Sequence, residues 1–292
     1  MNSSEKPMQE WNVQDAQNLS AGKFLRLIWL TIKSFFKEKI GIVILSAILL
    51  IMLWGYHGNL DLLQFVIKDW SAPGLFMDTR PQILSWVPWD RELISFWMGA
   101  FLLVIIPTII IRFGFKHRIR DYGLALPTKE KRTAGFILFT TLVVISIFPF
   151  YLAAKNADMQ LVYPFYKQFF SITEFVWYEL SYFPFFFAIE FIFRGYLLFG
   201  ISNNLNMKSM PATATSTTID VGKYAVIISM LSYTAWHLGK PLTELWGTPI
   251  WGLVAGVGTY YVRSIWPVLT AHFLLNVFLD AMILHNLHLS PF

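Results

Sequence analysis

The sequence predicts an all-α, multi-pass transmembrane helical bundle of about seven spans, preceded by a basic amphipathic helix. Of the 292 residues, 55% are hydrophobic and only 14% are charged, whereas soluble domains carry about 25% charged residues. Apolar runs near the ~20 residues that cross a bilayer recur along the chain. They fall at 40–57, 93–113, 134–154, 173–200, 224–239, 246–262 and 265–285.

The N-terminal region divides into a polar tail, residues 1–22, and a segment 23–39 that mixes basic and aromatic residues. The tail has no apolar stretch of the kind found in a cleavable signal peptide. The pattern of 23–39 is typical of a helix that lies on an anionic membrane surface. A juxtamembrane linker would show the same composition, so the sequence leaves both interpretations open.

Charged residues predict the orientation of the bundle. The loop between the second and third spans is basic, through Arg112, Lys116, Arg118, Arg120, Lys129, Lys131 and Arg132. The segment 58–92 is acidic, through Asp61, Asp69, Asp78, Asp90 and Glu92. By the positive-inside rule, the N-terminus and the 112–133 loop lie on the cytoplasmic side of the cell membrane, and the C-terminal tail 286–292 lies outside.

Composition also excludes several classes of functional site and of binding partner. The chain has no cysteine, which excludes disulfides, thiolate metal ligands and cysteine nucleophiles. No basic cluster is interleaved with aromatic residues on a soluble domain, so a nucleic-acid partner is not expected. The expected partners are the lipid bilayer and a membrane-associated peptide or protein.

Three polar pairs interrupt the apolar spans, each at a spacing of four residues. They are Glu190 and Arg194, Tyr233 and His237, and His272 and Asn276. On an α-helix, residues four apart lie on one side, and an ionisable side chain at membrane depth is costly unless it meets a partner. We therefore expect one shared polar pocket, which is a candidate active site.

The residue types allow two kinds of chemistry. His237, His272 and Glu190 are the ligand types of a mononuclear hydrolytic site for zinc or another divalent metal. Without metal, a Glu and a His would activate water directly as a general base. Asn276 is a donor for a developing oxyanion, and Arg194 is expected to hold Glu190 in a buried ion pair.

These motifs resemble the CPBP-type intramembrane proteases, which include CAAX prenyl endopeptidases and the Abi or bacteriocin-immunity proteins. That family shows EExxxR, FxxxH and HxxxN on successive helices. His272 to Asn276 matches the last motif, and Tyr233 to His237 matches the second with Tyr for Phe. The resemblance covers 173–285, which it implies to be the catalytic core, and leaves the helices of 40–172 without a motif.

One position departs from the family. Ile189 stands where the first Glu of EExxxR belongs, and the resemblance implies that this Glu activates water. A step of one residue turns a side chain by about 100°, so Glu190 cannot take its neighbour's direction unchanged. We expect Glu190 to assume the role, ahead of Glu244; Glu179 is interpreted as an interfacial residue near the outer leaflet. Loss of proteolysis is the third outcome.

The predicted function is therefore an intramembrane endopeptidase, a hydrolase that cuts a peptide bond of a membrane-associated substrate with metal-activated or Glu/His-activated water. The alternative is a non-catalytic membrane protein of the same fold, such as an immunity or sorting partner. A transporter that uses the polar pocket for ions draws on the same residues.

Overall fold

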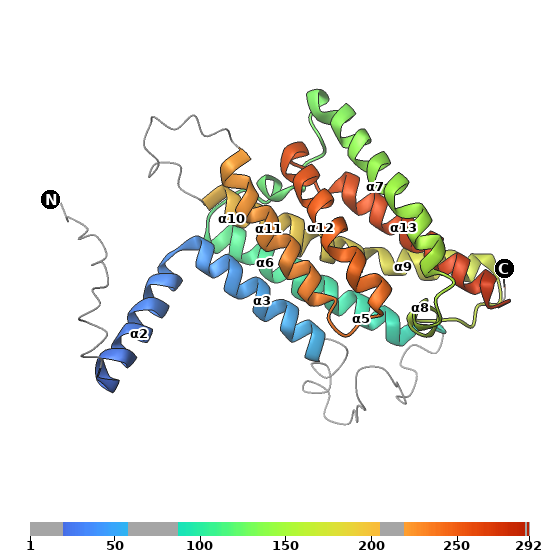
Figure 1. Cartoon of the computed structure of the whole chain (residues 1–292), viewed down its shortest axis with the longest axis horizontal. Helices are drawn as coiled ribbons and strands as arrows, with labels where there is room; N and C mark the ends of the chain where they lie inside the picture. The colour runs from blue at the N-terminus through green and yellow to red at the C-terminus, as the bar shows by residue number, and fades with distance from the viewer. Residues whose placement is uncertain (1–19, 58–86, 205–218, 290, 292) are drawn as a thin grey trace.

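The computed structural model describes residues 20–57, 87–204, 219–289 and 291 (Figure 1). Within these ranges it contains helices and no strand. The N-terminal helices are α2 (Ala21–Lys37), α3 (Lys39–His57), α5 (Asp90–Ala100), α6 (Ile106–Ile109), α7 (Arg132–Ala153) and α8 (Ala157–Val162). The remaining α-helices are α9 (Ile172–Glu190), α10 (Leu198–Asn204), α11 (Ile219–Trp236), α12 (Leu242–Val262) and α13 (Trp266–Asn286). Most of the predicted polar tail and most of the acidic segment 58–92 lie outside the described residues.

The all-α membrane bundle predicted from the sequence is confirmed. Each predicted span coincides with a helix, and α2 begins two residues before the predicted amphipathic segment. In the part of the chain that the structure describes, four helices are long and apolar enough to cross a membrane: Glu92–Gly114, Lys129–Ala153, Ile172–Asn204 and Trp266–Asn286. Lys39–Trp54 is a shorter apolar helix. Seven crossings, and their orientation, therefore stay a prediction.

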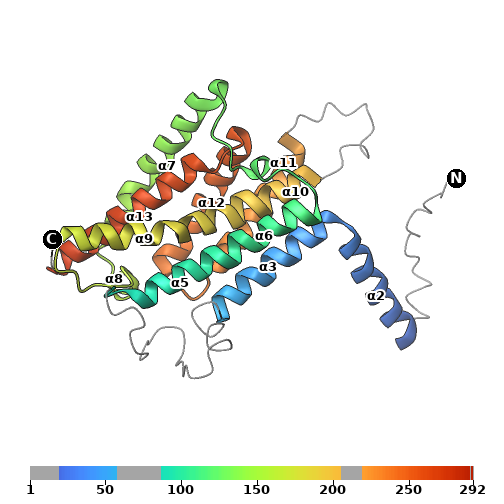
Figure 2. The same cartoon turned by 180° about the vertical axis from the view of Figure 1, so that it is seen from behind.

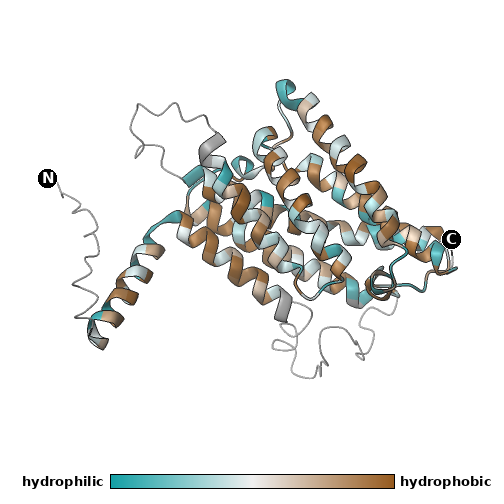
Figure 3. Ribbon diagram, in the orientation of Figure 1, coloured by the Kyte–Doolittle hydropathy of each residue, from teal (hydrophilic) through white to brown (hydrophobic). Residues whose placement is uncertain are grey.

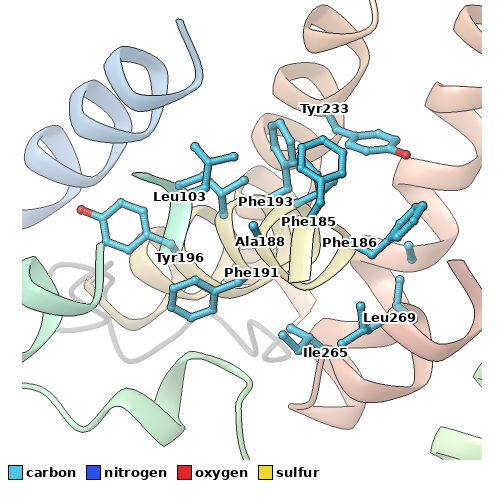
Figure 4. Close-up of a cluster of buried hydrophobic side chains, with 14 of the residues drawn as sticks. Leu103, Phe185, Phe186, Ala188, Phe191, Phe193, Tyr196, Tyr233, Ile265 and Leu269 are labelled. Atoms are coloured by element: carbon cyan, nitrogen blue, oxygen red, sulfur yellow. The ribbon is translucent and has the colours of Figure 1, made fainter. Parts of the chain in front are cut away.

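The helix that runs from Ile172 to Asn204 forms the centre of the bundle. Of the residues in its most apolar stretch, 89% are buried, against 22% for Lys129–Ala153. It passes between α13 and the α5–α6 rod, and α11 and α12 cover its far side (Figures 1 and 2). Side chains leave it in several directions and pack against neighbours such as Leu103, Tyr233 and Leu269 (Figure 4). Three charged residues on this helix, Glu179, Glu190 and Arg194, therefore lie in the interior.

Local sequence explains how the central helix begins and why it is irregular. The hydroxyl of Ser171 accepts a hydrogen bond from the backbone N–H of Glu174, at 3.2 Å, and caps the N-terminus of α9. Between α9 and α10 the turns are π-helical, from Phe191 to Leu197. Such widened turns occur often at functional sites. Ser229 on α11 donates a 2.9 Å hydrogen bond to the carbonyl of Phe193, inside this stretch.

The outer helices present large apolar side chains outward. Phe113, Phe136, Phe148, Trp246 and Ile250 are each more than 60% exposed. Apolar residues recur along these helices, and hydrophilic residues gather at several of their ends (Figure 3). A soluble monomer rarely exposes so much contiguous apolar surface, so this surface fits the hydrocarbon region of a bilayer.

Two short connections bend back toward the bundle: the residues that follow α8, and the turn between α11 and α12. The fifth predicted span, 224–239, ends earlier than expected, since α11 stops at Trp236 and Gly239 takes a left-handed conformation with φ of 90°. The turn places Glu244, in the first turn of α12, against Tyr163, which follows α8. The stretch after His237 therefore folds back into the bundle.

We expect that Gly200→Ala destabilises the protein by about 1–3 kcal/mol, because a new methyl group would overpack the contact between α10 and α3. The added Cβ would lie 2.7 and 2.9 Å from the two γ-methyl groups of Val43. Val43→Ala removes both methyls, so the penalty should shrink in that background. The measurement is the free energy of unfolding in detergent for the four members of this double-mutant cycle.

Gly247→Ala is the matched control, since nothing lies within 4 Å of the position of its Cβ. It should leave stability unchanged or raise it by up to about 1 kcal/mol. An equal cost of Gly200→Ala in both backgrounds would show that the close contact with Val43 is not the cause.

Candidate active site

A small cavity lies inside the bundle where the central helix, α13 and the turn before α12 meet. Its polar wall consists of Tyr163, His237, Lys240, Glu244, His272 and Asn276. The volume is about 40 Å³, which is room for about three waters. Ile189 and aromatic side chains form the apolar wall. The cavity therefore combines a few titratable groups with water-sized space in an apolar setting.

The first Glu–His pair joins the central helix to α13. Nδ1 of His272 lies 2.6 Å from Oε1 of Glu190, and the Glu190 side chain is fully buried. Nη1 of Arg194 lies 3.4 Å from both carboxylate oxygens of Glu190. Because this cation keeps the carboxylate ionised, the imidazole nitrogen is the donor in the short contact.

Arg194 is itself held by an aromatic ring from α11. The guanidinium carbon lies 3.9 Å from the centroid of the Tyr233 ring, and the Arg194 side chain is fully buried. A desolvated cation–π contact of this kind is worth about 2 kcal/mol. The expected Arg194–Glu190 pair is therefore present, and Tyr233 supports it from the helix that leads to His237.

The second Glu–His pair lies at the cavity itself. Nε2 of His237 is 3.2 Å from Oε1 of Glu244. Lys240 donates to the same oxygen at 3.0 Å, and the hydroxyl of Tyr163 donates to both carboxylate oxygens, at 3.1 and 3.0 Å. Nδ1 of His237 donates to the carbonyl of Tyr233 at 2.7 Å, so Nε2 is the ring nitrogen that faces Glu244.

Asn276 connects the cavity to two buried carboxyl groups. Its amide nitrogen donates to Oδ2 of Asp280 at 3.1 Å, and the same side chain interacts with Glu179. Glu179, expected from the sequence to be interfacial, is instead only 3% exposed and interacts with Asp280. The bond to Asp280 fixes the plane of the Asn276 amide.

The structure thus brings His237, His272, Asn276 and Glu244 to one cavity. Glu190 is not part of the cavity wall and reaches it through His272. The neighbouring position faces the cavity but holds Ile189, which follows the 100° step between successive helical residues. Among the described residues, the carboxylate at the cavity is therefore Glu244, the one that sequence reasoning ranked second.

Sequence reasoning missed two members of this cluster. Lys240 stands four residues before Glu244, and this spacing within a turn was a usable signal for an ion pair. Tyr163 gave no signal, because its contact with Glu244 joins positions 81 residues apart.

The donor set does not form a ready metal site. Within the described ranges, no three His, Cys, Asp or Glu side chains gather in a way that could hold a metal ion. Glu190 is engaged by Arg194 and His272, and Lys240 places a positive charge beside Glu244. The zinc expectation for His237, His272 and Glu190 gains no support from this arrangement and stays a prediction.

A comparison with known protein families matched the segment that contains these helices. Residues 172–278 match the family model of the type II CAAX prenyl endopeptidase Rce1-like proteins, a CPBP family. The family resemblance stated from the sequence is confirmed for this segment. The Rce1-like segment contains all three polar motifs and supports a CAAX-type intramembrane protease fold. Neither the curated proteins nor the solved structures gave a match to the chain.

We expect Arg194→Met to destabilise the protein by about 3–5 kcal/mol, because it leaves the buried carboxylate of Glu190 without its cation. Arg194→Met combined with Glu190→Gln removes both charges and should regain part of this loss. Arg194→Lys should be intermediate, since a point charge cannot stack on Tyr233 as a planar guanidinium does. Unfolding free energies in detergent provide the measurement. If Arg194→Met were as stable as the wild type, the buried pair would not be a structural requirement.

Proposed function

We propose that the protein is an intramembrane endopeptidase in which Glu244 and His237 activate a water molecule for attack on a peptide bond. The observation that carries the proposal is the Glu244–His237 contact in the wall of a water-sized cavity inside the Rce1-like segment. The substrate is a membrane-associated peptide or protein, and the family match makes C-terminal prenylated peptides the first substrates to test.

Each polar group has a role in this reaction. The carboxylate of Glu244 takes a proton from the water, whose oxygen attacks the carbonyl carbon of the substrate. Oε2 of Glu244 accepts only the bond from Tyr163 among the described residues, so it retains a lone pair for this proton. Nε2 of His237, which lies 3.2 Å from Oε1 of Glu244, contacts the same water and orients it.

The negative charge that develops on the substrate oxygen needs donors. The side-chain amide of Asn276 at the cavity wall is the donor to this oxygen, and His272, which Glu190 holds through Nδ1, lines the same wall. The protonated Glu244 then gives its proton to the departing amide nitrogen as the C–N bond breaks. Burial keeps the reacting water apart from bulk solvent.

The competing function is a non-catalytic membrane protein that binds a peptide, such as an immunity or sorting partner. Ile189 favours it, because an apolar side chain stands where the family carries its first Glu. The two proposals differ in one measurable property, which is turnover of a bound peptide. A transporter remains the third class and would require ion movement across vesicles.

We expect Glu244→Gln to lower cleavage of a membrane peptide by about 10²–10⁴-fold, because an amide keeps the shape of the carboxylate but accepts no proton. Ile189→Glu in the Glu244→Gln background should restore part of the turnover, since position 189 faces the same cavity. Ile189→Gln in that background is the matched control and should restore none. The assay uses purified full-length protein in vesicles with a fluorogenic membrane peptide.

Full turnover by Glu244→Gln would exclude Glu244 as the base and return attention to Glu190 and His272. A wild-type protein that binds the peptide but never cleaves it would instead establish the non-catalytic function. Unfolding midpoints of all variants separate loss of chemistry from loss of fold.

Metal removal tests the zinc expectation separately. If Glu244 acts without a metal, dialysis of the reconstituted protein against EDTA should leave turnover within about twofold of the untreated sample, because a carboxylate base requires no Lewis acid. A loss that added Zn²⁺ restores would support a metal-activated water and refute the metal-free route. A zinc peptidase treated in parallel shows that chelation was complete.

A further inference from the structure

Helix α2 stands apart from the bundle. None of its residues from Ala21 to Lys37 is buried, and it projects away from the end of α3 in both views (Figures 1 and 2). Its large apolar side chains are correspondingly exposed: Leu25 is 65% exposed and Trp29 is 60% exposed. The rest of the described chain therefore does not account for the apolar surface of this helix.

The helix has two chemically distinct faces. At 100° per residue, seven apolar side chains fall within an arc of about 140°. They are Phe24, Leu25, Ile28, Trp29, Ile32, Phe35 and Phe36. The opposite arc carries the basic residues Lys23, Arg26, Lys33 and Lys37. The colouring of α2 shows the same mixture of hydrophobic and hydrophilic residues along its length (Figure 3).

The position of α2 is fixed at one end of the bundle. A single residue, Glu38, separates it from α3, the apolar helix that begins at Lys39. The ammonium of Lys39 lies 3.0 Å from Nε2 of His117 and 3.4 Å from the carbonyl of Phe115. These contacts tie the junction to the loop that carries Arg112 through Arg132. Helix α2 thus starts from the basic end of the bundle.

We propose that α2 lies in the headgroup region of the membrane, with its aromatic stripe toward the acyl chains and its basic face on anionic lipid headgroups. A stripe of this size is costly in water, and the adjoining apolar helix holds it at membrane level. Four basic residues on the other face match a negatively charged headgroup layer, to which each Lys or Arg contributes about 1 kcal/mol. The same arrangement makes the protein prefer membranes rich in anionic lipid.

The absence of cysteine makes the test clean, because a single introduced cysteine is the only labelling site. Ile28→Cys probes the apolar face, and Ser34→Cys, about 120° away, probes the opposite side. Full-length protein carrying a nitroxide is reconstituted in vesicles of phosphatidylcholine, with or without 30% phosphatidylglycerol. Accessibility to oxygen and to a water-soluble nickel complex is measured at each site.

In anionic vesicles we expect the label at Ile28 to be at least threefold more accessible to oxygen, relative to nickel, than the label at Ser34. The contrast should fall in pure phosphatidylcholine, and when Lys23, Arg26, Lys33 and Lys37 are all changed to Gln. The matched control changes four basic residues of the loop between the second and third predicted spans to Gln (Lys116, Arg118, Arg120 and Lys129). It should preserve the contrast.

Equal nickel accessibility of the two labels in anionic vesicles would overturn the proposal, because it would place both faces of α2 in water. The proposal would also be overturned if the accessibility contrast between the two labels stayed the same without anionic lipid and with the four Gln substitutions. Anionic headgroups would then have no part in holding the helix. Neither result depends on peptidase activity, so the proposed function is tested independently.

Discussion

The carboxylate of Glu190 imposes the requirement that organises the interior. A charge that is fully buried in an apolar bundle must be paired, and its partner Arg194 is equally buried. The guanidinium rests in turn on the ring of Tyr233, and the carboxylate holds His272. Three helices, α9, α11 and α13, are thereby fixed relative to one another by polar contacts. Apolar packing alone specifies such registers poorly, because lipid tails are as apolar as the side chains.

The second pair is built differently and suits a different task. Glu244 is 18% exposed at its side chain, against none for Glu190, and its partners come from connections that fold back rather than from the central helix. A group at a cavity wall with a free lone pair is able to exchange protons, whereas a group enclosed by an arginine is not. The division resembles other sites in which two carboxylates take separate roles because their surroundings differ.

The sequence was sufficient for the all-α bundle and for several of the polar residues that line the cavity. Each apolar run coincides with a helix, because the bilayer imposes a length on apolar helices. The four-residue spacings pointed to His237, His272 and Asn276, which line the cavity, and to Glu190, which contacts His272. It was insufficient for two reasons. The contact of Tyr163 with Glu244 depends on tertiary folding of a connection, which periodicity does not encode. Glu179 was wrongly predicted to lie at the membrane interface. Its partner, Asp280, lies on another helix, and the sequence does not show that the two side chains meet in the interior.

The size of the cavity governs how a substrate reaches these groups. A volume of about 40 Å³ accommodates waters, while pockets that bind drug-sized molecules measure about 300–1,000 Å³. If the protein acts as proposed, a peptide therefore reaches Glu244 only when the helices around the cavity move apart. The rate at which the protein acts on a substrate is then the product of the chemical step and the fraction of molecules that are open. Bilayer thickness and lateral pressure, which act on the spacing of helices, would regulate that fraction without touching the site.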